Sequence, residues 1–142
     1  MNPRQLPPEL RRAFEETHYQ IHHQSPFTLR IGQLSPELDA LLHASGHSCA
    51  AFITACNPMS EPLPDAENRA RQQQLVDELM RQGHVCIPGL GQHPGNGWSG
   101  EESALVLGLP KSDALQIART HRQWAFVWVA LGQTAQLVES TA

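Results

Sequence analysis

The chain has 142 residues, of which 40% are hydrophobic and 17% charged, and its formal net charge is −4. This length fits a single domain spanning residues 1–142, with a core large enough to fold without disulfides. The slightly negative charge argues against a nucleic-acid partner, which would call for a basic stripe. Apolar runs are too short for a membrane span, and residues 1–12 lack the apolar stretch of a signal peptide. We therefore expect a cytoplasmic protein with neither nucleic acid nor membrane as partner.

Cysteine and histidine are present without a recognisable metal pattern. The three cysteines have no metal-site or redox-motif spacing, which favours small buried hydrophobes in a reducing compartment. Two pairs of histidines are four residues apart, but neither pair has a third ligand at a diagnostic spacing. We expect no metal site and no cofactor. Cys56 could act as a nucleophile only with a nearby base and a lowered pKa.

The first elements are predicted from prolines and hydrophobic spacing. Two prolines at positions 7 and 8 open a helix that we expect to run to His18 or Tyr19, within an N-terminal helical extension over residues 1–24. Residues 27–32 alternate like a strand. Ser35 caps a second helix, which Gly46 ends. One face of the first helix carries Leu10, Ala13, Phe14 and Thr17.

The rest of the chain alternates strands and helices. Residues 49–56 are continuously apolar, which is typical of a strand covered on both faces. A long helix follows from Asp65 to just before Gly83, and a later helix is capped by Ser112. The remaining predicted strands cover residues 85–87, 103–109, 124–131 and, at an edge, 136–138.

This order predicts an α+β fold. Residues 49–131 follow the βαββαβ plan of ferredoxin-like domains. We expect a two-layer sandwich with this core, extended by the N-terminal helix and a βα unit, so that residues 25–138 form the α+β core. In that plan the end of the first strand and the hairpin after the second open at one edge of the sheet. Asn57 should therefore meet the segment 89–103.

Residues 89–103 form an unusual predicted loop, with five glycines, a tryptophan and two carboxylates in fifteen residues. Loops this long are often functional, and plain linkers rarely contain tryptophan. Gly89 and Gly91 allow a ligand to approach the backbone closely. Their spacing does not match a dinucleotide-binding or phosphate-loop motif.

These segments predict a polar cleft. Glu101 is the candidate acid–base catalyst, because a carboxylate beside Trp98 would be partly desolvated. Each assignment has a structural alternative: Asn57 as a turn residue, Trp98 as a plug of the core edge, Arg71 on a solvated helix face, and Glu101 as an acceptor for loop amides, with Glu102 turned inward instead. The expected ligand-binding residues are Asn57, Ser60, Asn68, Arg71, Gly89, Gly91, Trp98 and Ser103.

Four motifs along the chain form a combined pattern: Phe52-Ile53-Thr54-Ala55-x-Asn57-Pro58-x-Ser60, Glu67-Asn68-x-x-Arg71, Gly89-x-Gly91-x-x-Pro94-x-x-x-Trp98-x-x-Glu101-x-Ser103 and Gln123-x-Ala125-x-Val127-x-Val129. This pattern resembles a known family. From about residue 26 to residue 137, the chain is similar to the bacterial family catalogued as domain of unknown function 3293. That family usually has an acidic residue before the loop proline, where this chain has His93. The resemblance implies a cytosolic, single-domain bacterial protein with no assigned reaction.

Two functions are compatible with the sequence. The first is a binding protein for a small polar or anionic molecule, or an enzyme of the hydrolase or transferase class, that uses the cleft between the Asn57 loop and residues 89–103. The second is a non-catalytic interaction module that docks, or forms a homodimer, through the glycine-rich Trp98 segment. Sequence alone does not decide whether the chain is an enzyme.

Overall fold

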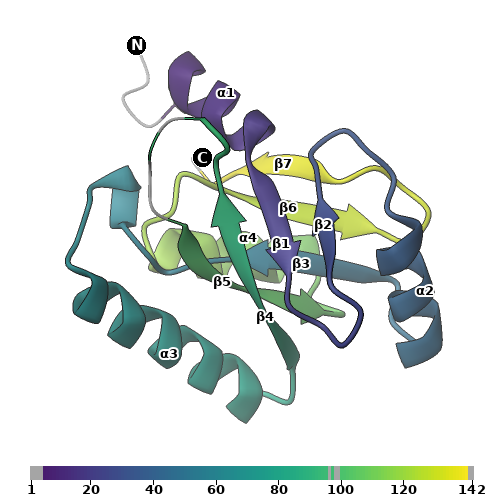
Figure 1. Cartoon of the computed structure of the whole chain (residues 1–142). Coiled ribbons are helices and arrows are strands. Elements are labelled where there is room, and N and C mark those ends of the chain that lie inside the picture. Colours follow the sequence, from purple (N-terminus) through teal and green to yellow (C-terminus); the bar gives the residue numbers. More distant parts are fainter. Residues whose placement is uncertain (1–4, 96, 98–99, 141–142) are drawn as a thin grey trace.

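The structure, a computed structural model, describes residues 5–95, 97 and 100–140 (Figure 1). In this part of the chain four α-helices and seven strands build one α+β fold, which confirms the predicted class. In chain order the elements are α1 (Pro8–Glu16), β1 (His18–Ile21), β2 (Phe27–Leu29), α2 (Pro36–Ser45), β3 (Cys49–Ile53), the 3-10 turn η1 (Pro58–Ser60), α3 (Asp65–Arg81), β4 (Val85–Gln92), β5 (Glu101–Leu107), α4 (Lys111–Thr120), β6 (Ala125–Ala130) and β7 (Gln136–Glu139).

The strands form a single antiparallel sheet in the order β2-β1-β4-β5-β3-β6-β7. An isolated bridge joins Ile31, after β2, to Ala135, before β7. Because these residues lie next to opposite edges of the sheet, the sheet curls into a half-barrel. The predicted edge strand at residues 136–138 is confirmed as β7, paired with β6.

Helices cover both faces of the curled sheet. Leu75 of α3 and Ala114 of α4 pack with Ile53 on the outer face. Leu42 of α2 packs with Phe52 inside the curl. The strand β3 is buried along its whole length, as its apolar sequence predicted. The expected two-layer sandwich is therefore wrong in one respect, because a strand apolar on both faces needs cover on both, and α2 supplies the second cover.

The N-terminal helix ends earlier than expected. Thr17 has extended backbone angles, so α1 stops at Glu16. Residues His18–Ile21 form β1, which pairs with both β2 and β4 and buries Tyr19 and Ile21. The predicted end of this helix at His18 or Tyr19 is wrong, because the short alternation of His18–Ile21 places two large side chains in the core as part of a strand.

Two predicted helix signals are confirmed and one is wrong. The Ser35 hydroxyl accepts a hydrogen bond from the backbone N–H of Leu38, and Gly46 ends α2 in the left-handed conformation with φ 74°. Ser112 does not cap α4, since Pro110 holds the N-cap position and no side chain caps this helix.

The predicted glycine-rich loop is shorter than expected. The strand β4 continues through Gly89 and Gly91 to Gln92, and β5 begins at Glu101. A β-carbon on Gly89 would lie 2.6 Å from the carbonyl oxygen of Gln20 and 2.8 Å from the Phe52 ring. Glycine is needed here because the neighbouring strand and an aromatic ring approach the backbone closely; it does not mark a loop.

Candidate functional site

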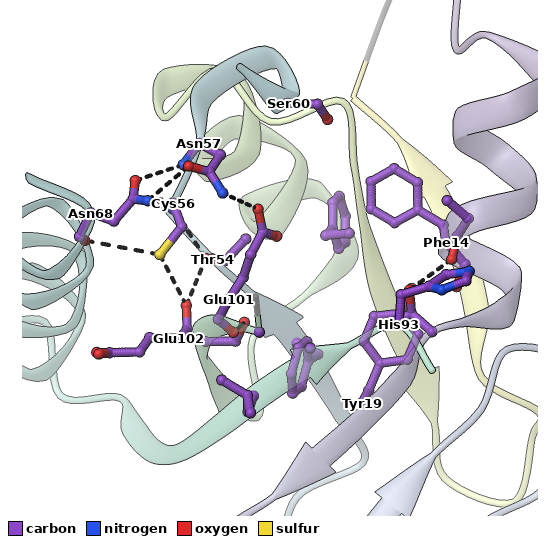
Figure 2. Close-up of a pocket in the computed structure, with 18 of the residues that line it drawn as sticks. Phe14, Tyr19, Thr54, Cys56, Asn57, Ser60, Asn68, His93, Glu101 and Glu102 are labelled. Carbon is purple, nitrogen blue, oxygen red and sulfur yellow. Dashed lines mark hydrogen bonds between the residues drawn. The ribbon is translucent and has the colours of Figure 1, made fainter. Parts of the chain in front are cut away.

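A cavity of about 570 Å³ opens where β3 ends, β5 begins and α1 passes over the sheet (Figure 2). The segment Asn57–Ser60 and the start of α3 form one side, and α1 and β1 form the other. Apolar side chains line much of it, including Leu10, Phe14, Tyr19, Phe52, Leu63 and Leu90. Its polar lining includes Thr54, Asn57, Ser60, Asp65, Asn68, Arg69, His93, Glu101, Glu102 and Ser103.

Asn57 connects several segments on the polar side of the cavity through hydrogen bonds. Its Nδ2 donates to Glu101 Oε2 at 2.7 Å, and its Oδ1 accepts from the Leu63 backbone N–H at 3.0 Å. Its backbone is left-handed, with φ 47°, as are those of Met59 and Ser60. Non-glycine residues seldom adopt this conformation, and such strain concentrates at functional sites.

Asn68 holds Asn57 in place from the first turn of α3. The Asn57 backbone N–H donates to Asn68 Oδ1 at 2.9 Å, and Asn68 Nδ2 donates to Asn57 Oδ1 at 2.7 Å. The two asparagines thus form a reciprocal pair, which fixes the direction in which Asn57 Nδ2 points toward Glu101.

Glu101 turns into the cavity, which answers the question that the sequence left open between Glu101 and Glu102. Its Oε2 accepts from Asn57, whereas its Oε1 accepts no hydrogen bond from the residues that the structure describes. Burial raises the pKa of Glu101, and the hydrogen bond from Asn57 offsets part of that rise. The carboxyl group therefore keeps its proton to a higher pH than an exposed glutamate.

Glu102 points the other way. Its exposed carboxylate Oε1 lies 3.7 Å from Arg69 Nε. Its backbone carbonyl accepts from Thr54 Oγ1 at 2.7 Å and from Cys56 Sγ at 3.4 Å. Successive side chains of a strand point to opposite faces, so the Glu101 carboxyl group enters the cavity, whereas the Glu102 carboxylate points away although Glu102 is a lining residue.

Neither candidate nucleophile is activated. Burial raises the pKa of the Cys56 thiol, and the charges of Glu101 and Glu102 raise it further, which opposes formation of a thiolate. The Ser103 hydroxyl is buried and donates to the Glu101 carbonyl oxygen at 3.0 Å.

The predicted ligand-binding residues separate into three groups. Asn57, Ser60, Asn68, Gly91 and Ser103 line the cavity together with Glu101, and Trp98 lies outside the described residues. Gly89 and Arg71 are not among the lining residues. Arg71 instead lies near His121, where it adds to a lowering of that histidine's pKa that burial chiefly causes. Two residues earlier on α3, Arg69 lines the cavity where Arg71 was expected to do so.

The wall formed by α1 was not predicted as part of the site. The four residues expected on one face of the first helix, Leu10, Ala13, Phe14 and Thr17, line the cavity. His93 Nε2 lies 3.0 Å from Glu16 Oε1, which links the β4–β5 connection to this helix. The amphipathic spacing of α1 was the available signal, but it did not reveal which surface the helix would cover.

Within residues 5–95, 97 and 100–140, no three histidine, cysteine or acidic side chains are grouped so that they could hold a metal ion. The helices in this part of the chain are also too short or too polar to cross a membrane.

The family described as "Protein of unknown function (DUF3293)" matches residues 53–126, just over half of the chain. The protein belongs to this family, and the matched region contains Asn57, Asn68 and Glu101. Comparison with curated proteins and with solved structures gave no match.

Proposed function

We propose that this protein binds a small molecule in the cavity beside Glu101. The observation that carries the proposal is a carboxyl group held by Asn57 through one oxygen, with its second oxygen accepting nothing from the described residues. Concave sites with apolar walls and a few placed polar groups are typical of ligand pockets. The ligand that fits has an apolar body and a group that donates a hydrogen bond to Glu101 Oε1.

The polarity of the lining favours this ligand over the anion expected from the sequence. Among the described lining residues, Asp65 adds a carboxylate to that of Glu101, and the one arginine, Arg69, already pairs with the exposed Glu102. An anion beside Glu101 would meet a like charge, and Arg71 is not available in the cavity to neutralise it.

Proton donation is the chemistry available to a bound substrate. Because burial raises the pKa of Glu101, this group is suited to act as a general acid. A hydrolase or transferase would use it to protonate a leaving group. Neither Cys56 nor Ser103 is set up as a nucleophile, so ligand binding is the function that we propose first.

We further propose that β3, α3, β4, β5, α4 and β6 form a ferredoxin-like unit. The strand order β4-β5-β3-β6, the antiparallel pairing and the packing of α3 and α4 in one hydrophobic cluster support this. A cytoplasmic location stays a proposal as well, supported by the three cysteines, which are all free.

A screen of varied small molecules by ligand-observed NMR and thermal shift tests the binding function. Ala13 lines the cavity on α1, so Ala13→Phe should fill part of it and weaken any ligand found. Ala40, exposed on α2 beside the other end of β3, provides the matched control Ala40→Phe, which should bind as the wild type does. Equal weakening by both variants, or no ligand from a broad screen, would overturn the proposal. Co-purification of a partner protein or a homodimer in that case would support the interaction module instead.

A further inference from the structure

Aromatic side chains from three elements face the same cavity as Glu101. They are Phe14 of α1, Tyr19 of β1 and Phe52 of β3. In Figure 2, Phe14 and Tyr19 lie across the cavity from Asn57, with the Glu101 carboxylate between the two sides.

Two of the rings are held by contacts within the protein. The Tyr19 and Phe52 rings meet edge to face, with centroids 5.2 Å apart and planes at 74°. The Tyr19 hydroxyl donates to the backbone carbonyl oxygen of Phe14 at 2.6 Å, which ties β1 to α1. The aromatic wall is therefore preorganised, so that a ligand does not have to order it on binding.

The carboxylate opposite this wall has no cationic partner among the residues that the structure describes. Glu101 forms no ion pair within the described part of the chain, and Arg69 lies at the rim, paired with exposed Glu102. Asp65 adds another carboxylate to the lining. A carboxylate removed from water is costly when it is charged and unpaired.

We propose that the ligand of this cavity carries an organic ammonium group, which donates to Glu101 Oε1 while the aromatic wall holds the apolar part beside it. This inference rests on the proposed binding function and specifies its ligand class. A cation satisfies Glu101 and is attracted by the faces of aromatic rings, whereas a neutral donor gains only the hydrogen bond and an anion is repelled.

Three compounds with the same ring and different charge test the inference. They are cyclohexylmethylamine, cyclohexylmethanol and cyclohexanecarboxylate, titrated at neutral pH and followed by NMR of the protein. We expect the amine to bind at least about tenfold more tightly than the alcohol, and the carboxylate to bind most weakly. Glu101→Gln keeps an acceptor for Asn57 but loses the charge, so it should reduce the preference for the amine over the alcohol to less than about threefold. Glu37→Gln, at an exposed position in the first turn of α2 that is not among the lining residues, is the matched control and should keep the full preference.

A second variant keeps the test valid if Glu101→Gln does not fold. Phe14→Leu retains apolar volume on α1 but removes one ring, so it should weaken the amine several-fold, by about threefold or more, and leave the alcohol nearly unchanged.

The outcomes distinguish a failure of the ammonium inference from a failure of the proposed binding function. If the alcohol or the carboxylate binds as tightly as the amine, or if the screen finds cavity ligands and the amine is not among them, the ammonium inference is wrong and the binding function stands. If no compound of any class binds in the cavity, both are wrong.

Discussion

Asn57 uses every hydrogen-bonding group of its side chain, together with its backbone N–H, to connect three segments. Through these groups it contacts Asn68 on α3, the Leu63 backbone and Glu101 on β5. The left-handed backbone at φ 47° places the side chain where it can reach all of them. The strain in this conformation is balanced by the hydrogen bonds, so stability and the orientation of Glu101 depend on the same residue.

Replacing Asn57 should therefore lower folding stability, and alanine and glycine at this position should lower it by different amounts. Asn57→Ala removes the partners of the Leu63 backbone N–H and of Glu101 Oε2, together with one of the two bonds of Asn68 Nδ2. It should lower the free energy of unfolding by about 2–4 kcal/mol. Asn57→Gly loses the same bonds, but glycine adopts the left-handed conformation without strain. The free energy of unfolding of the glycine variant should therefore be about 1 kcal/mol higher than that of the alanine variant. Urea unfolding measures both. If Asn57→Ala lowers the free energy of unfolding by less than about 1 kcal/mol, or if Asn57→Gly is no more stable than Asn57→Ala, this role of Asn57 is contradicted.

Glu101 should make folding stability depend on pH in a direction opposite to that of most carboxylates. The folded protein raises the pKa of Glu101, so it holds this proton more tightly than the unfolded chain does. Above the ordinary range of glutamate the folded state then binds more protons, and the free energy of unfolding contributed by Glu101 falls as pH rises through the raised pKa.

The variant Glu101→Gln isolates this effect, because it cannot titrate. We expect Glu101→Gln to gain stability relative to the wild type as pH increases from about 4 to 8, by about 1.4 kcal/mol for each unit of pKa difference. Urea unfolding at several pH values measures the difference. A difference that stays constant, or a wild type that gains over glutamine with rising pH, would show that Glu101 is not buried as described.

At the level of elements, β4 is a strand although its composition is typical of a loop. It contains Pro88, Gly89 and Gly91, yet it pairs along its length with β5 and over residues 89–92 with β1. Gly89 lies against the Gln20 carbonyl and the Phe52 ring, whereas a β-carbon on Gly91 would meet its nearest neighbours at 3.8–4.0 Å. Close packing therefore requires glycine at position 89, whereas position 91 has room for a β-carbon.

This difference predicts opposite results for one substitution at two nearby positions. Gly89→Ala forces backbone and an aromatic ring apart and should destabilise the protein by about 2–3 kcal/mol. Gly91→Ala makes ordinary contacts and should stay within about 0.5–1 kcal/mol of the wild type. Thermal or urea unfolding of both variants checks this. Similar losses at the two positions would mean that Phe52 does not pack on Gly89.

Some of these elements could be predicted from the sequence and others could not. The meeting of Asn57 with Glu101 followed from the expected order of strands, and the structure confirms that contact at 2.7 Å. The strand β1 was missed because four alternating residues are a weak signal next to a strong helix start. The extension of β4 was missed because glycine and proline normally indicate a loop, and the ring of Phe52 that requires Gly89 comes from a distant segment.

At the level of the whole molecule, the curl of the sheet explains why a cavity exists. The bridge between Ile31 and Ala135 draws the two edges together, α2 fills the inside near one end of β3, and α1 passes over the other end (Figure 1). The helix α1 has no fully buried residue of its own, yet its apolar face lines the cavity. The site is thus enclosed by parts of the chain that are far apart in sequence, which is why its aromatic wall could not be inferred from local motifs.

The central claim is that the cavity holds a small molecule against the free oxygen of Glu101. Crystals of the protein soaked with cyclohexylmethylamine, or with the best compound of the screen, test it most directly. We predict ligand density between Phe14 and Asn57, with a donor atom about 3 Å from Glu101 Oε1. Density at another surface, or a cavity closed by the protein's own side chains in crystals whose ligand binds in solution, would contradict the claim.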